Sequence, residues 1–246
     1  MPKTLFLLIT LASLLSCDQL KKQTEKALES ENPNVVKKYH ENGKIKTYYE
    51  INELKQRHGN AWFYNKKGIV TKSFVYDNGE KVKAFQYYEN GKPLMEINYK
   101  NEVKDGPVKR FYENGQVESE IMYADNQPGK GLKEFSKSGK PRTKYPSLVI
   151  KPIDQLKKNG KYIIQVFFDN QPGRGNYYMG KLTDGIYMHG GLSKLPESNY
   201  RGQFTIEPAP GVMLMEKLYF VGEFKTPTGN KYIVEESFNL AIDTTY

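Results

Sequence analysis

Apolar and polar residues alternate around five glycine-centred turns in the first part of the chain. In the copy 111-FYENGQVESEIMY-123, Phe111 stands four positions before Gly115, and apolar residues follow the glycine at two, six and eight positions. The same offsets recur around Gly43, Gly68, Gly91 and Gly139, except that the last copy lacks the apolar residue at eight. Even offsets that are apolar on both sides of a turn predict a β-hairpin with one apolar face.

The apolar pattern also predicts the length of each turn. A two-residue Asn-Gly loop would pair Phe111 with Glu118, whereas a three-residue Glu-Asn-Gly loop pairs Phe111 with Val117. A slip of one residue would move every side chain to the other face, so we predict the three-residue loop. Its glycine takes a positive φ, which is costly for residues that carry a Cβ. The same register pairs Tyr39 with Ile45 and Tyr64 with Val70.

The turn glycines are 25, 23, 24 and 24 residues apart, a period that indicates stacked repeats. We therefore predict an extended antiparallel meander of five β-hairpins over residues 35–147. The abundance of tyrosine, 19 residues against a single Trp, suits such strands. On the face opposite the phased aromatics we predict that Tyr48, Tyr88 and Tyr112 contact a ligand; the alternative is that they only cover the sheet or pack against a second domain.

The repeated pattern resembles a known family. The pattern is an aromatic residue, two variable residues, Asn-Gly, one variable residue, an aliphatic residue and a later Tyr. Together with intervening stretches such as 57-RHGNAWFY-64 and 105-DGPVKRFY-112, this pattern is similar to the MORN-repeat variant. The resemblance covers residues 35–147. The last copy, 136-SKSGKPR-142, loses Asn-Gly, and 52-NELKQ-56 is inserted in the first linker. Bacterial proteins with this variant are often described as antitoxin components, so the resemblance implies an immunity or antitoxin-like protein as an alternative function.

The period is lost after Pro146. Residues 148–246 contain seven short apolar segments separated by turn clusters such as 169-DNQPGRG-175 and 225-KTPTGN-230. Seven short strands in a segment of this length predict an antiparallel β-sandwich, and an immunoglobulin-like one is the first choice. The whole chain is therefore predicted to be all-β.

The N-terminus predicts export and lipidation. Residues 1–16 have a basic residue, an apolar core and Leu-Leu-Ser before Cys17, which is the only cysteine. This arrangement resembles a bacterial lipobox and implies cleavage before Cys17 and its acylation; the alternative is an ordinary signal peptide. Residues 17–34 form a polar tether. We predict a membrane-anchored lipoprotein of the bacterial cell envelope, on the periplasmic side or in the outer membrane.

The positive charge is concentrated in the repeats and the tether. Residues 18–147 carry 25 basic and 18 acidic side chains, whereas residues 148–246 carry 11 and 10. Such an excess suits anionic lipid or an envelope polymer, although a solvated basic face is the simpler alternative. We expect no nucleic-acid partner, because the predicted location is outside the cytoplasm.

Candidate catalytic groups are few. His189 lies in 184-DGIYMHGGLSK-194 near Asp184 and Ser193, but no G-x-S-x-G motif supplies a nucleophile. Glu118 and Glu120 are predicted to pair with Lys109 or Arg110 across strands. No cofactor motif or metal-ligand spacing is found. We predict a non-enzymatic lipoprotein whose repeats bind a protein or a polysaccharide, with an enzyme centred on His189 as an alternative.

Overall fold

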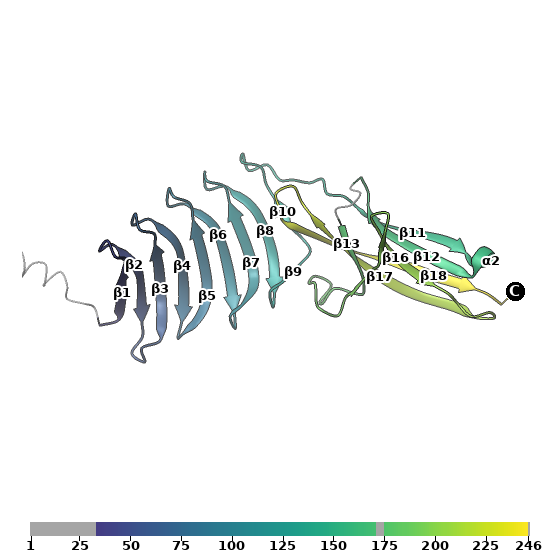
Figure 1. Cartoon of the computed structure of the whole chain (residues 1–246), viewed down its shortest axis with the longest axis horizontal. Coiled ribbons are helices and arrows are strands. Elements are labelled where there is room, and N and C mark those ends of the chain that lie inside the picture. Colours follow the sequence, from purple (N-terminus) through teal and green to yellow (C-terminus); the bar gives the residue numbers. More distant parts are fainter. Residues whose placement is uncertain (1–32, 171–174, 246) are drawn as a thin grey trace, which may run out of the picture.

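The computed structural model describes residues 33–170 and 175–245. These residues form a ten-stranded antiparallel sheet, followed by two four-stranded sheets (Figure 1). The predicted signal peptide, Cys17 and almost all of the tether lie outside the described residues. The prediction of an all-β chain is confirmed, since the described part contains a single four-residue helix, α2 (Leu156–Asn159).

The large sheet follows chain order from β1 to β8, and β10 completes its far edge beside β8. Its strands are β1 (Val35–Tyr39), β2 (Ile45–Ile51), β3 (Arg57–Tyr64), β4 (Val70–Asp77), β5 (Glu80–Tyr87), β6 (Pro93–Lys100), β7 (Val103–Phe111), β8 (Val117–Ala124), β9 (Gln127–Pro128) and β10 (Lys133–Glu134). Figure 1 shows β1 to β8 side by side in a curved slab. The predicted meander is confirmed for four hairpins, but the fifth copy contributes only β10 and an isolated bridge between Phe135 and Pro141, so the prediction of a fifth full hairpin is wrong.

The predicted three-residue turns are also confirmed. Phe111 pairs with Val117, the Gly115 amide donates to the Tyr112 carbonyl at 2.8 Å, and Gly115 has a φ of 92°. The other predicted pairs, Tyr39 with Ile45 and Tyr64 with Val70, are present too. At the other ends of the strands, two-residue turns with positive φ, such as Asn78–Gly79, join one hairpin to the next.

The prediction of one apolar face for each hairpin is wrong. In β7 and β8, Phe111 pairs with Val117 but Arg110 pairs with Ser119, so Glu118 is an extra residue in β8. This β-bulge places Glu118 on the same side as Arg110, and their charged groups lie 3.4 Å apart. Beyond the bulge, alternation puts Phe111 and Val117 on the face opposite Ile121. The same register shift occurs beside Tyr39, Tyr64 and Tyr87.

The sheet therefore has two different faces. The core face carries a row of directly paired residues: Tyr49, Ala61, Phe74, Ala84, Ile97, Val108 and Ile121. Most of this row is buried, and Leu132 joins its C-terminal part in a hydrophobic cluster. The open face carries the alternate row: Tyr48, Trp62, Ser73, Phe85, Glu96, Lys109, Glu120 and Lys133.

Residues 148–245 form two four-stranded antiparallel sheets that share one hydrophobic core. The first contains β11 (Leu148–Gln155), β12 (Lys161–Phe168), β16 (Arg201–Ile206) and β15 (Glu197–Ser198). The second contains β14 (Ser193–Lys194), β13 (Gly175–Met179), β17 (Met213–Lys225) and β18 (Lys231–Asp243). Alternate residues of β12, among them Ile164 and Val166, point into this core and are fully buried. The immunoglobulin-like assignment stays a prediction.

The turn between β17 and β18 contacts the end of the large sheet (Figure 1). Ser119 Oγ donates a hydrogen bond to Asn230 Oδ1 at 3.3 Å, and the rings of Tyr145 and Tyr232 stack 4.5 Å apart. Backbone bonds from Lys130 to Ile186 and from Met188 to Pro128 add a second contact. The repeats are therefore joined to the second part by side-chain and backbone contacts as well as by the chain.

Candidate functional site

Five aromatic residues gather on the open face of the N-terminal repeats. They are Tyr48, Trp62, Tyr64, Phe85 and Tyr87, here called the aromatic strip. Trp62 and Phe85 each lie close to Tyr87, with ring centroids 6.2 and 6.3 Å apart and planes inclined by 28°. The Tyr87 hydroxyl and Ser73 Oγ share a hydrogen bond of 2.8 Å. All five side chains are half-buried, so the strip offers partly exposed rings.

Paired charges follow the aromatic strip on the open face. Lys83 contacts Glu96 at 3.0 Å, while Lys109 and Lys133 both contact Glu120, at 3.6 and 3.1 Å. The predicted cross-strand pairs of Glu118 and Glu120 with Arg110 and Lys109 are thereby confirmed. The face thus changes along the sheet, from aromatic at the N-terminal repeats to paired charges near the second part.

The three predicted ligand-contact tyrosines do not share one surface. Tyr48 is opposite Trp62 in the aromatic strip. Tyr88 and Tyr112 lie next to the hairpin turns, and their hydroxyls donate to the carbonyls of Phe111 and Phe135 at 2.7 and 2.8 Å. Burial raises the pKa of both phenols, so they remain protonated donors at neutral pH. These two tyrosines connect successive hairpins, and a contact with ligand stays a prediction for all three.

Other turn residues form a series of side-chain hydrogen bonds from one hairpin turn to the next. The sequence patterns did not predict these bonds. His40 occupies the same turn position as Tyr88 and bonds the Tyr64 carbonyl at 3.0 Å. Asn114 Nδ2 donates to the Lys137 carbonyl at 3.0 Å, and Lys92 Nζ donates to the Asn114 carbonyl at 3.1 Å. The recurrence of Asn immediately before the turn glycine is the feature of the sequence from which these hydrogen bonds could have been predicted.

His189 is bonded to backbone groups of its own loop. Its Nε2 lies 2.8 Å from the Lys181 carbonyl, and its Nδ1 accepts a hydrogen bond from the Gly191 amide at 3.0 Å. Both ring nitrogens are therefore engaged by backbone rather than by Asp184 or Ser193.

Within residues 33–170 and 175–245, no group of three or more His, Cys, Asp or Glu side chains is placed to hold a metal ion. No helix of that same part is long and apolar enough to cross a membrane.

A buried carboxylate, Glu134, lies where the large sheet meets the β17–β18 turn. It is 2% exposed and accepts hydrogen bonds from Thr226 Oγ1 at 2.7 Å, from Asn230 Nδ2 at 2.8 Å and from Thr228. Arg142 Nη1 lies 3.5 Å away. Burial alone would raise the pKa of Glu134, but the hydrogen bonds and the Arg142 charge outweigh it and hold the pKa below its ordinary value. An ionised Glu134 thus connects the repeats to the second part.

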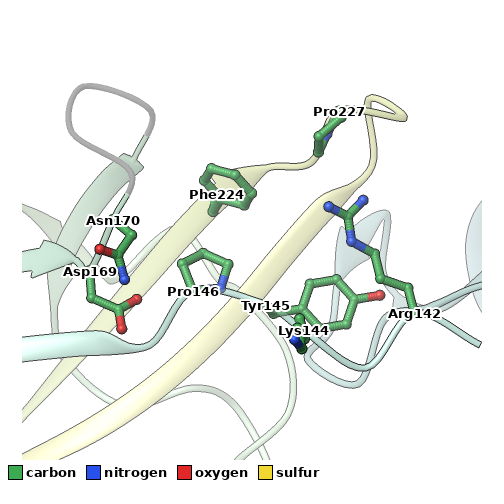
Figure 2. A pocket seen from close by; sticks show the side chains of 8 residues that line it. All are labelled: Arg142, Lys144, Tyr145, Pro146, Asp169, Asn170, Phe224 and Pro227. Atoms are coloured by element: carbon green, nitrogen blue, oxygen red, sulfur yellow. The ribbon is translucent and has the colours of Figure 1, made fainter.

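Next to this carboxylate is a cavity of about 260 Å³. Its lining residues are Arg142, Lys144, Tyr145, Pro146, Asp169, Asn170, Phe224 and Pro227 (Figure 2). Figure 2 shows Pro146 between Asp169 and Asn170 on one side and Tyr145 on the other. Burial and the nearby Glu134 charge raise the pKa of Tyr145 to about 12, so its hydroxyl is protonated at neutral pH. This cavity could not be predicted from local patterns, because its lining comes from three separate segments.

Three hairpins match a family model. The model is described as the MORN repeat variant, and it matches residues 34–52, 82–101 and 104–125. These ranges correspond to the β1–β2, β5–β6 and β7–β8 hairpins. No curated protein matches the chain. MORN repeats are generally modules that bind proteins or membranes, which is the coarse function that the match supports.

Proposed function

We propose that this protein is a non-enzymatic lipoprotein of the bacterial cell envelope, whose MORN-like repeats bind a protein or polysaccharide partner through the aromatic strip. The observation that carries the proposal is the clustering of Tyr48, Trp62, Phe85 and Tyr87 on one sheet face, outside the hydrophobic clusters of the fold. Nothing in the packing of the described residues accounts for so many rings on that side.

The chemistry of the strip suits a contact surface. Large rings supply extensive contact area, and tyrosine adds a polar tip that can bond to a partner. Tyr and Trp are enriched at interfaces and among the residues that dominate binding energy. The ion pairs at Glu96 and Glu120 border the strip with charges that already have partners, so a bound partner need not neutralise them.

Membrane attachment completes the proposal. Acylation of Cys17 with two or more chains gives stable anchoring, at about 0.8 kcal/mol for each buried CH₂ group. The strand β1 begins at Val35, so a short segment separates the anchor from the repeats. The aromatic strip is in the first repeats and would therefore be held near the membrane.

The test compares two neighbouring residues on opposite faces. A photo-crosslinking amino acid is placed at Tyr48, on the open face, or at Tyr49, on the core face, and intact envelopes are irradiated. We expect a discrete crosslinked species from position 48 and none from position 49, identified by mass spectrometry or by sugar analysis. Equal crosslinking from both positions, or from neither, would contradict the proposal. A toxin as the crosslinked species would assign an immunity function instead.

A further inference from the structure

We propose that the cavity between Arg142 and Asp169 is a binding site for one acidic sugar residue, carrying a carboxylate or a phosphate. The site is distinct from the aromatic strip and does not depend on it. Its residues come from the 142–146 linker, from the end of β12 and from the β17–β18 turn.

Two cations supply the recognition of the anionic group. Lys144 is exposed, and it has no ion pair or hydrogen bond with any residue that the structure describes. Among the residues that the structure describes, Arg142 has a single ionic contact, a long one of 3.5 Å to Glu134. A guanidinium has five N–H donors, so Arg142 retains donors for a second anion. Arginine and lysine together are a common setting for a carboxylate or a phosphate.

Asp169 and Asn170 supply the groups that a sugar hydroxyl requires. Asp169 Oδ1 accepts the Ser147 amide hydrogen at 2.6 Å, and the second carboxylate oxygen remains an acceptor. The Asn170 amide provides both a donor and an acceptor. An anion without hydroxyls would use only the cationic side of the cavity, which is why a sugar acid fits the lining better than a simple ion.

Two prolines of the lining suit the apolar face of a ring. Pro146 is half-buried and Pro227 is exposed, and the buried Phe224 lies beneath them. The Tyr145 ring is fixed by stacking on Tyr232, with planes inclined by 9°. A cavity of about 260 Å³ is close to the lower limit of small-molecule sites, about 300 Å³, so a single ring is the appropriate size.

The experiment titrates the full chain in detergent with glucuronate, glucose 6-phosphate, glucose and inorganic phosphate, using ligand-observed NMR. We expect both sugar acids to bind, and glucose to bind about tenfold more weakly because it lacks the charge-assisted bonds. Lys144→Gln should weaken the binding of both sugar acids to a similar degree. Lys151→Gln, which removes another exposed lysine of the same part, should leave it unchanged.

Three results would overturn the proposal. They are an absence of binding by either sugar acid, unchanged binding in Lys144→Gln, and inorganic phosphate binding as tightly as the sugar acids. Because Lys144 is exposed and unpaired among the described residues, its substitution tests the site without unfolding the chain. Loss of the aromatic strip in Trp62→Ala should not change these titrations, so failure here is distinguishable from failure of the proposed function.

Discussion

At the scale of single residues, Glu134 shows how a buried charge is stabilised by donors that are distant in sequence. Three of its hydrogen-bond donors, Thr226, Thr228 and Asn230, lie 92 to 96 residues later in the chain. A buried carboxylate is costly unless it is paired and bonded, and here three hydroxyls, an amide and a guanidinium meet that requirement. Sequence reasoning did not find Glu134, because nothing local distinguishes it from the exposed glutamates of the hairpins.

Glu134→Gln should destabilise the protein by about 2 to 3 kcal/mol, because the substitution replaces charge-assisted hydrogen bonds with neutral ones. It also places an NH₂ group, which can only donate, among side chains that already donate to this position. The pH dependence has a definite sign. The pKa of Glu134 is held below its ordinary value of 4.5, so its stabilisation is present above that pH and is lost as the pH falls through the lower folded value. Urea unfolding of wild type and variant at neutral and acidic pH measures the free energy of unfolding of each. An equal loss of stability on acidification in both proteins would contradict the role of the Glu134 charge.

Tyr112→Phe should destabilise the repeats by about 1 kcal/mol, because it removes the hydroxyl bond to the Phe135 carbonyl. Tyr48→Phe is the matched control, since the described residues give its hydroxyl no hydrogen bond. The unfolding temperatures of the two variants and of the wild-type protein are compared. If Tyr112→Phe unfolds like wild type but loses partner binding, the role of Tyr112 is contact with ligand rather than connection of hairpins.

At the scale of elements, the hairpins show where sequence patterns succeed and where they fail. The three-residue turn was predictable because it depends on local chemistry, an Asn-Gly followed by an aliphatic residue. The assignment of faces was not, because a bulge shifts the alternation by one residue while the spacing in the sequence stays the same. Glu118 and Ser119 are ordinary strand residues, and only the pairing of Arg110 with Ser119 reveals the extra one.

Ile121→Ala tests the observed faces. Ile121 is 8% exposed on the core face, so the substitution should cost about 2 to 4 kcal/mol. Met122→Ala is the control on the opposite face, where the side chain is 38% exposed, and its cost should be much smaller. Urea unfolding gives both values. Similar losses in the two variants would mean that both faces of this hairpin are packed.

At the scale of the whole molecule, the repeats present different surfaces at their two ends. The C-terminal end is occupied by the contacts of Glu134 and Ser119 with the β17–β18 turn. The aromatic strip lies among the first repeats of the sheet. The repeat architecture was predictable from the period, whereas the contacts between the repeats and the following sheets depend on residues that have no repeated pattern.

Cys17→Ser should abolish acylation and move the protein from the membrane fraction to the soluble fraction, because no other cysteine is present. Metabolic labelling with palmitate and fractionation of envelopes measure both effects. A labelled Cys17→Ser variant, or an unlabelled wild-type protein, would show that the N-terminus is not processed as a lipobox.

Trp62 provides the most direct test of the aromatic strip as the binding surface. It is the only tryptophan in the chain and lies within the strip, so its fluorescence reports on that surface alone. The chain is titrated with the partner identified by crosslinking, and quenching of Trp62 by acrylamide is measured. We expect the bound partner to shield Trp62 and to lower its quenching constant; saturated binding with an unchanged quenching constant would contradict the role of the aromatic strip.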